Sequence, residues 1–489
     1  MIYQSTRNNN ELVNSAEAVV KGIADDGGLY MLSDFSKLNF DYKSVLNLTA
    51  METAEKILGA LLDDFSAGQM KNMVEKAYKG RFETDELTPT VKVGNDFVLE
   101  LFRGPTSAFK DVALSMLPRL MTEGRKMLSK ENDTVILTAT SGDTGKAALE
   151  GFHDVEGIKI IVFYPDGGVS AVQKAQMVTQ EGSNVCVCAV KGNFDDAQTG
   201  VKNAFAAFKK SGITSVQLSS ANSINIGRLV PQVVYYFTAY SSLVKMGEIN
   251  VGDKINFVVP TGNFGDILAG YFAKCMGLPV NKLICASNAN NVLTDFITTG
   301  LYDRRREFFK TISPSMDILV SSNLERLLYL LSDGDAEKVA TYMKDLNEKG
   351  YYKVSDDILE KLQETFVAAY CNDEETLKTI KKVYDDNGYL CDTHTAVAFA
   401  ANYLKPQEGK TVILSTASPY KFPVAVLSAL GEDNIDNEFR VMDRIRALTG
   451  VPIPKNLAGL ESKPVLHSCV IEKDEITDFV MKKVAEEKW

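Results

Sequence analysis

Short apolar runs alternate with amphipathic, helix-forming stretches along most of the chain. The runs have the length of buried strands and cover residues 134–139, 159–164, 184–190, 215–218, 255–260, 282–287 and 411–414. Strands that alternate with helices are typical of parallel sheets whose two faces are both covered by helices. The pattern therefore predicts an α/β fold.

Both ends of the chain depart from this alternation. Residues 1 to about 85 are mostly helical in pattern, and residues 475–487 predict a terminal helix. Residues 91–102 predict a hairpin that turns at Gly94.

The strand signal also fades between residues 290 and 392, where amphipathic helices are predicted at 335–349 and 355–370. A chain of 489 residues is too long for one core. We therefore expect three regions: a mainly helical region over 1–90, a large α/β domain over 91–130 and 235–489 with a helical insertion at about 290–392, and a small α/β domain over 131–234.

The composition limits the kinds of partner that the protein is expected to bind. A net charge of −11 opposes binding to nucleic acid or to an anionic membrane, but it allows a small local anion site. The polar segment 1–10 has no apolar signal core, and no apolar run is long enough to span a bilayer. We expect a cytoplasmic monomer or homodimer that acts on a small molecule.

The cysteines indicate reduced thiols. There are seven, an odd number without a disulfide framework. Cys391 and His394 have a ligand-like spacing, but no second pair accompanies them. We expect no metal site.

Lys110 is the first candidate for chemistry. It follows a glycine-proline turn in GPTSAFK (104–110), and apolar residues resume at Val112. Burial disfavours the ammonium form, so a lysine in such surroundings can act as a nucleophile. Alone, it could equally be a lysine on the polar side of a helix, but two loops of the phosphate-binding type follow it.

The first loop is TATSGDTGK (138–146), which follows a predicted strand and opens a predicted helix. Its glycines let the backbone approach a ligand, and free amides at the helix start attract anions. A Walker A loop would need glycine at 140 and Ser or Thr at 147, where the chain has Thr140 and Ala147. The loop therefore predicts an anion site of another kind.

The second loop is PTGNFGD (260–266), which suits a phosphate monoester held by backbone amides. Two such loops at the carboxyl ends of strands support each other, because open parallel sheets bind ligands along that edge. A third unit, LSTASPYK (414–421), brings Thr416 to the same edge, while Ser418 before Pro419 has the pattern of a helix cap.

A fourth segment, SANSINIGR (220–228), offers hydroxyl, amide and guanidinium donors at the start of a long helix. Arginine presents a fixed fork to phosphate or carboxylate, although a polar helix start explains the segment equally well by itself. One lysine, two anion loops and this patch together predict a pyridoxal phosphate enzyme that acts on an anionic amino acid.

With these segments the chain resembles the threonine synthase family of fold-type-II pyridoxal phosphate enzymes. The resemblance runs from Thr6 to about Phe422 and includes ELFRGPT (100–106), SAFKD (107–111), 138–145, 220–228, 262–266 and 416–417. The length and the helical segment are similar to the longer members found in many bacteria and fungi. The resemblance implies a tryptophan synthase β-like fold, with two open, twisted, mostly parallel sheets flanked by helices and a mainly helical N-terminal segment.

The resemblance also implies a role for each candidate site residue. Lys110 is expected to form a Schiff base with pyridoxal 5′-phosphate. Cofactor binding is expected from Gly262, Asn263, Phe264, Gly265, Asp266 and Thr416, with Thr416 at the ring nitrogen. Substrate binding is expected from Thr140, Ser141, Asp143, Thr144, Ser223, Asn225 and Arg228. Relatives often have histidine in place of Ser418, so Ser418 receives no catalytic role, and His394 is interpreted as structural or as a support for the site.

The implied reaction eliminates phosphate from O-phospho-L-homoserine and adds water to give L-threonine. The nearest alternative is another fold-type-II enzyme, such as a serine or threonine dehydratase or a β-replacing synthase. A non-catalytic metabolite-binding relative is the alternative from another class. The donors at Ser223, Asn225 and Arg228 favour a phosphorylated substrate, and the retained Lys110 disfavours a non-catalytic protein.

Overall fold

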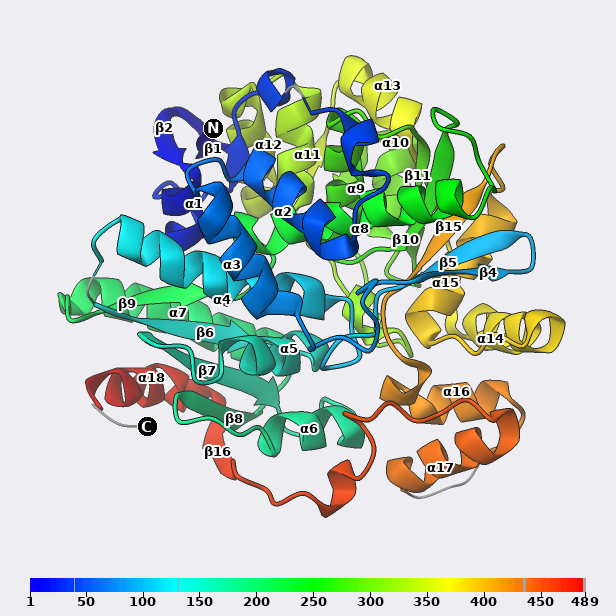
Figure 1. Ribbon diagram of the computed structural model, residues 1–489. Helices are drawn as coiled ribbons and strands as arrows, with labels where there is room; N and C mark the ends of the chain where they lie inside the picture. The colour runs from blue at the N-terminus through cyan, green and yellow to red at the C-terminus, as the bar shows by residue number, and fades with distance from the viewer. Residues whose placement is uncertain (39, 131, 434–436, 487–489) are drawn as a thin grey trace.

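Two sheets and the helix between them organise the molecule (Figure 1). The computed structural model describes residues 1–38, 40–130, 132–433 and 437–486. Helix α4 (Lys110–Met127) packs against α5 (Asp143–Phe152) on one side and α8 (Ile226–Lys245) on the other. Lys110 is thus the first residue of the helix that joins the two halves.

The larger sheet has the strand order β14-β11-β10-β15-β5-β4. Its strands are β14 (Phe366–Tyr370), β11 (Val280–Ser287), β10 (Ile255–Pro260), β15 (Thr411–Ser415), β5 (Asp96–Glu100) and β4 (Thr90–Val93). All neighbours are parallel except β4 and β5, which form the predicted hairpin. Helix α15 (Thr393–Leu404) packs on β10, β11 and β15, while α9 (Gly265–Cys275) packs on β10 and β11.

The smaller sheet is wholly parallel and has the order β16-β8-β7-β6-β9. Its strands are β16 (Cys469–Glu472), β8 (Val185–Lys191), β7 (Ile158–Pro165), β6 (Asp133–Ala139) and β9 (Val216–Ser220). Buried side chains on one face of β6 and β7 form a cluster with α7 (Phe194–Ser211) and α18 (Ile476–Ala485), and those on the other face join the core beside α5. Both faces are covered, which explains why these strands are apolar without alternation.

The remaining helices lie mainly around the sheets. They are α1 (Ser15–Lys21), α2 (Ala50–Leu61), α3 (Ala67–Tyr78), α6 (Ala171–Val178), α10 (Val292–Thr299), α11 (Leu324–Leu331), α12 (Ala336–Glu348), α13 (Asp356–Thr365), α14 (Asp373–Asn387), α16 (Pro423–Ala429) and α17 (Glu438–Thr449). Within the described part of the chain, none of the helices combines the length and the apolar character that crossing a membrane requires.

The prediction of one helix over 355–370 is wrong over residues 366–370. Helix α13 ends at Thr365, and β14 begins at Phe366 and pairs with β11. The sequence FVAAY suits either state, and pairing with a buried parallel strand decides it. The two short strands β12 (Leu301–Asp303) and β13 (Tyr351–Lys353) were also missed in this insertion, where they pair only with each other.

Two expectations about the regions of the chain, one on a domain boundary and one on secondary structure, also differ from the structure. The division placed residues 235–489 in the large domain, but β16 pairs with β8 and α18 packs on α7, so this part of the chain completes the smaller sheet. The N-terminal region contains an antiparallel sheet of β1 (Ile2–Ser5), β2 (Asn8–Asn14) and β3 (Tyr30–Leu32) beside its helices. The strand β2 is largely polar and exposed, so it lacks the apolar signal that identifies a strand.

The segments singled out in the sequence all follow the carboxyl ends of strands. Strands β5, β6, β9, β10 and β15 lead into the segments at 101–109, 140–142, 221–225, 261–264 and 416–418. Open parallel sheets bind ligands at this edge. The carboxyl edges of the two sheets face each other, since Lys110 lies near Asp143, Asn323 bonds both Ser223 and Asn263, and Phe109 bonds Thr416. We call this shared space the ligand edge.

The close approach of α4 and α5 depends on Gly151. A Cβ atom at this position would overlap the carbonyl oxygen of Leu114 on α4. We predict that Gly151→Ala lowers the free energy of unfolding by about 1 to 3 kcal/mol, because the helices must move apart. Gly59→Ala on α2 is the matched control, since nothing lies within 4 Å of its new methyl group.

Urea denaturation of the two variants checks this. Gly59→Ala should gain roughly 0.5 to 1 kcal/mol from helix propensity alone. If Gly151→Ala were stabilised to the same extent, the contact between α4 and α5 would not be limited by this glycine.

Candidate active site

Lys110 is fixed by a pairing between the segments that follow β5 and β15. The amide of Phe109 donates a hydrogen bond to the carbonyl oxygen of Thr416 (2.8 Å), and the amide of Ser418 donates one to the carbonyl oxygen of Ser107 (3.1 Å). Ser107 has a φ of 59°, a conformation that non-glycine residues rarely adopt outside constrained sites. The structure therefore brings the segments that carry Lys110 and Thr416 together.

Lys110 is buried, with an exposed fraction of 8%. Its Nζ lies 4.0 Å from Asp143 Oδ2 and 4.8 Å from the centre of the Phe109 ring. Burial lowers the pKa of Lys110, Asp143 opposes this effect, and Arg228 and Lys421 reinforce it. A lowered pKa increases the neutral fraction of the amine, which is the nucleophilic form.

The loop after β6 is braced by one of its own side chains. Thr140 Oγ1 accepts hydrogen bonds from the amides of Gly142 (3.0 Å) and Gly145 (2.9 Å). Asp143 is the first residue of α5, and Ser141 and Thr144 are partly exposed beside it. The loop thus presents Ser141, Asp143 and Thr144 at the ligand edge, while the Thr140 hydroxyl maintains its shape.

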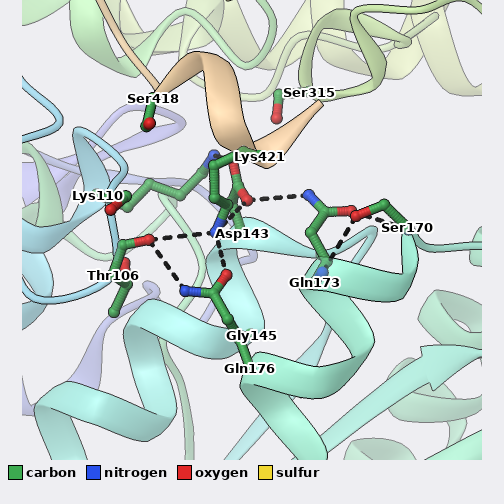
Figure 2. A network of polar contacts seen from close by, with 12 residues as sticks. Thr106, Lys110, Asp143, Gly145, Ser170, Gln173, Gln176, Ser315, Ser418 and Lys421 are labelled. Atoms are coloured by element: carbon green, nitrogen blue, oxygen red, sulfur yellow. Dashed lines mark hydrogen bonds and ion pairs between the residues drawn. The ribbon is translucent and has the colours of Figure 1, made fainter. Parts of the chain in front are cut away.

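Asp143 has buried partners that the sequence did not reveal (Figure 2). Its Oδ1 lies 3.0 Å from Lys421 Nζ and accepts a hydrogen bond from Gln173 Nε2 (2.9 Å). Burial alone would raise the pKa of Asp143, but Lys421 and Lys110 hold it below its ordinary value. The only sequence signal for Lys421 was its place between two aromatic residues at the end of LSTASPYK (414–421).

The loop between β10 and α9 lies beneath a segment of the helical insertion. A Cβ atom on Gly262 would lie 2.6 Å from the carbonyl oxygen of Ser315, so only glycine fits. Ser321 Oγ donates to the Gly262 carbonyl oxygen (2.7 Å), and Asn323 Nδ2 donates to that of Asn263 (3.0 Å). The insertion therefore covers the predicted phosphate loop, a role that its amphipathic pattern did not indicate.

His394 supports this cover. Its Nε2 accepts a hydrogen bond from the amide of Ser315 (3.1 Å), so its Nδ1 carries the hydrogen and donates to Asp392 Oδ2 (2.7 Å). Nε2 thus holds η3 (Pro314–Met316) over Gly262, while the bond from Nδ1 to Asp392 fixes the orientation of the ring. Among the residues that the structure describes, no group of three or more His, Cys, Asp or Glu side chains could hold a metal ion.

The segment after β9 separates into a frame and a ligand patch. Asn225 has no exposed surface, caps α8 by accepting from the amide of Gly227 (2.8 Å), and donates to the carbonyl oxygen of Val19 (3.0 Å). Arg228 is also buried, and it donates through Nη1 to the carbonyl oxygen of Ala221. Arg228 Nε is buried and has no hydrogen-bond partner.

The patch adjoins the glycine loop. Ser223 Oγ accepts a hydrogen bond from Asn323 Nδ2 (3.2 Å), the side chain that also holds the carbonyl oxygen of Asn263. A Cβ atom on Gly265 would lie 3.8 Å from the Cβ of Ser223. Phe264 before it has a φ of 62° and turns the chain into α9. The predicted phosphate loop at 260–266 and the patch at Ser223 are therefore neighbours.

Asp266 is the buried acid of this region. Its Oδ1 accepts hydrogen bonds from the hydroxyls of Tyr235 (2.5 Å) and Tyr236 (3.0 Å), whereas its Oδ2 is buried without a partner. Burial raises the pKa of Asp266 to about 6, although both tyrosines and Lys110 oppose the rise. Asp266 thus binds a proton in the folded protein at a pH where it would be ionised in the unfolded chain.

Three segments of the chain match known families. Residues 86–416 match the family described as pyridoxal-phosphate dependent enzyme. Residues 2–78 match the threonine synthase N terminus, and residues 393–479 match the threonine synthase C-terminal family.

Curated relatives and solved structures agree with these matches. Threonine synthase from Pseudomonas aeruginosa is 38% identical over 88% of this chain and 90% of its own length. Human threonine synthase-like 1 is 41% identical over 85% of this chain, but the chain spans only 58% of that protein. The crystal structure of PLP-bound threonine synthase from Brucella melitensis superposes with a TM-score of 0.87 at 36% identity and covers 99% of this chain and all of its own.

The raised pKa of Asp266 predicts a pH-dependent loss of stability. Its protonated form favours folding below the ordinary value of 3.8, and this contribution is lost as the pH rises through about 6. Asp266→Asn keeps an acceptor for the tyrosine hydroxyls and cannot ionise. Above about pH 7 we expect the variant to be more stable than the parent by roughly 1 to 3 kcal/mol, with the difference vanishing below about pH 4.

Denaturant unfolding of the cofactor-free protein across this pH range measures the difference. Asp333→Asn is the control, because the side chain of Asp333 is 83% exposed and its ion pair with Lys361 lies at the surface, where such a pair contributes at most about 1 kcal/mol. A difference for Asp266→Asn that stays constant over this range would show that the pKa of Asp266 is the same in the folded and the unfolded protein.

Proposed function

We propose, because the chain belongs to the threonine synthase family of pyridoxal-phosphate dependent enzymes, that it converts O-phospho-L-homoserine and water to L-threonine and phosphate. The observation that carries this proposal is the single arrangement of a buried Lys110 amine beside Asp143, with the glycine loop at 262–266 on the same ligand edge. A lyase of this kind needs a nucleophilic amine, a site for the cofactor phosphate and a second site for the substrate phosphate. We assign these roles to Lys110, to the loop at 262–266 and to the segment that contains Ser223 and Arg228.

The residues present fit pyridoxal 5′-phosphate. The Gly262 backbone has no room for a side chain, and the amides at the start of α9 face the ligand edge, which suits the cofactor phosphate. Lys110 is the amine for the cofactor aldehyde, and Thr416 at the end of β15 is the partner for the ring nitrogen. A hydroxyl can donate or accept, so Thr416 does not force protonation of that nitrogen as a carboxylate would.

The substrate fits between the two remaining segments. Its α-carboxylate is assigned to Ser141, Thr144 and the start of α5, where the helix dipole favours an anion. Its phosphate is assigned to Ser223 and to the free Nε of Arg228. We assign Thr140 and Asn225 to the frame, because their polar atoms already hold the backbone of this chain.

The chemistry divides between cofactor and protein. When bound, the cofactor would accept electron density from the substrate, so that protons can be removed from its carbon atoms. The Lys110 amine is placed to take the Cα proton and to return it at the end. Loss of a Cβ proton would supply the electron pair that expels phosphate from Cγ, and Arg228 would stabilise the departing phosphate. A proton is then added at Cγ, water adds its hydroxyl at Cβ, and the proton that water gives up goes to the phosphate.

We also propose that the protein works in the cytoplasm as a monomer or homodimer and holds its cofactor through a Schiff base at Lys110. The seven cysteines are all free thiols in the structure, which suits a reducing compartment.

The role of Lys110 is tested by Lys110→Ala. We expect this variant to lose the visible absorbance that the wild type acquires with pyridoxal 5′-phosphate, and to lose all turnover, because the Nζ of Lys421, the other buried lysine beside Asp143, is already bound by Asp143, Thr106 and Gln176. Absorbance spectra after dialysis and an assay of threonine formation measure both. Lys146→Ala, which removes a largely buried lysine paired with Glu150 on the same α5 helix as Asp143, should keep the absorbance. Threonine formation by Lys110→Ala would refute the assignment.

The role of Arg228 is tested by Arg228→Ala. We expect KM for phosphohomoserine to rise roughly 10- to 100-fold, the loss of one charged hydrogen bond, while cofactor binding stays near normal. Arg125→Ala is the matched control, because Arg125 is also buried but bonds the carbonyl oxygens of Gly157 and Asn132. Loss of cofactor as the main defect of Arg228→Ala would move Arg228 to the cofactor site.

A further inference from the structure

Lys421 is a second buried lysine at the site, and its side chain has no exposed surface. It ends η4 (Pro419–Lys421), the turn that follows β15. Its Nζ lies 3.0 Å from Asp143 Oδ1 and donates to the carbonyl oxygen of Thr106 (3.2 Å) and to Gln176 Oε1 (Figure 2). An ammonium group has three N–H donors, so each donor of Lys421 has an acceptor.

The three acceptors belong to three separate segments. Thr106 lies in the segment that leads to Lys110, Asp143 opens α5, and Gln176 is on α6. Helices α5 and α6 accompany the smaller sheet, whereas Lys421 follows a strand of the larger sheet. Lys421 therefore connects both sheets to the Lys110 segment at the ligand edge.

These contacts fix the direction of the Asp143 carboxylate. Its Oδ1 is held by Lys421 and by Gln173, and its Oδ2 faces Lys110. Gln173 is fixed in turn by Ser170, because each of the two residues bonds the backbone amide of the other through its side chain. Asp143 thus has one oxygen held by the frame and one directed at Lys110.

We propose that Lys421 is a positioning residue, whose ammonium group compensates the charge of Asp143 and directs its free oxygen at Lys110, so that the Lys110 amine stays neutral and nucleophilic. This inference rests on the proposed function, in which Lys110 is the amine that joins the cofactor.

The charges around Lys110 give the direction of the effect. The groups that face it are Asp143 on α5, Lys421 on η4, Arg228 on α8, Asp111 on α4 and Asp266 on α9. With Lys421 present, Asp143 is half of a buried ion pair and attracts a proton to Lys110 only weakly. Without Lys421, the negative charge of Asp143 is uncompensated, and it favours the ammonium form of Lys110.

The test is the pH dependence of cofactor capture by cofactor-free protein, followed by visible absorbance. Only a neutral amine attacks the aldehyde, so the midpoint of the capture rate reports the pKa of Lys110. Lys421→Met should move this midpoint upward by about one to three pH units, and Asp143→Asn should move it downward. Lys146→Met removes a neighbouring cation that pairs with Glu150 instead, and it should leave the midpoint unchanged.

Opposite shifts in the two variants distinguish charge compensation from a general packing defect. An unchanged midpoint in Lys421→Met, or a shift in the same direction in both variants, would overturn the inference. If Lys421→Met does not fold, Asp143→Asn decides alone, and the absence of a downward shift overturns it. Failure of the proposed function is seen separately, as a wild-type protein that captures no cofactor or a Lys110→Ala variant that still does.

Discussion

The contact between the Lys110 amine and the Asp143 carboxylate, at 4.0 Å in a buried site, is the interaction on which the rest of the structure depends. The amine begins the helix that joins the two halves, and the carboxylate begins the first helix of the smaller sheet. The two groups meet only if both sheets present their carboxyl ends to the same space. Close packing of α4 on α5 and the tie from Lys421 satisfy this condition. Burial in this space lowers the pKa of Lys110 and so increases the neutral fraction of an amine that would otherwise be a solvated cation.

Most strands and helices could be predicted from the sequence because they depend on local patterns. Apolar runs bounded by helical stretches identified the strands of both sheets apart from β4, β5, β14 and β16, and the hairpin at Gly94 identified β4 and β5. The strand β14 was missed because FVAAY continues a helical pattern, and its state is decided by β11, which lies far away in the sequence. The strand β16 is short and half exposed at the edge of its sheet, so it also gave little signal.

The candidate site likewise contains residues that the sequence identified and residues that it did not. Lys110, Thr416 and the loops after β6 and β10 were identified because glycines and hydroxyls after strands have a local meaning. The sequence did not identify the roles of Lys421 and Gln173, because each depends on a partner far away in the chain. For the same reason it did not reveal that the glycine loop is covered by Ser315, Ser321 and Asn323. Asn225 illustrates the reverse case: its pattern suited a ligand, whereas its amide is used to cap α8 and to bind Val19. Residue type indicates which chemistry is available, and tertiary contacts determine whether a polar group is still free to perform it.

The central claim is that Lys110, and no other buried lysine, is the reactive amine. Reduction of the cofactor-loaded protein with borohydride, followed by digestion and mass spectrometry, tests this most directly because it converts a Schiff base into a stable label. The account predicts a single pyridoxyl group on the peptide that contains Lys110. A label on Lys421 or Lys146, or no label on any of the three lysines, would contradict it.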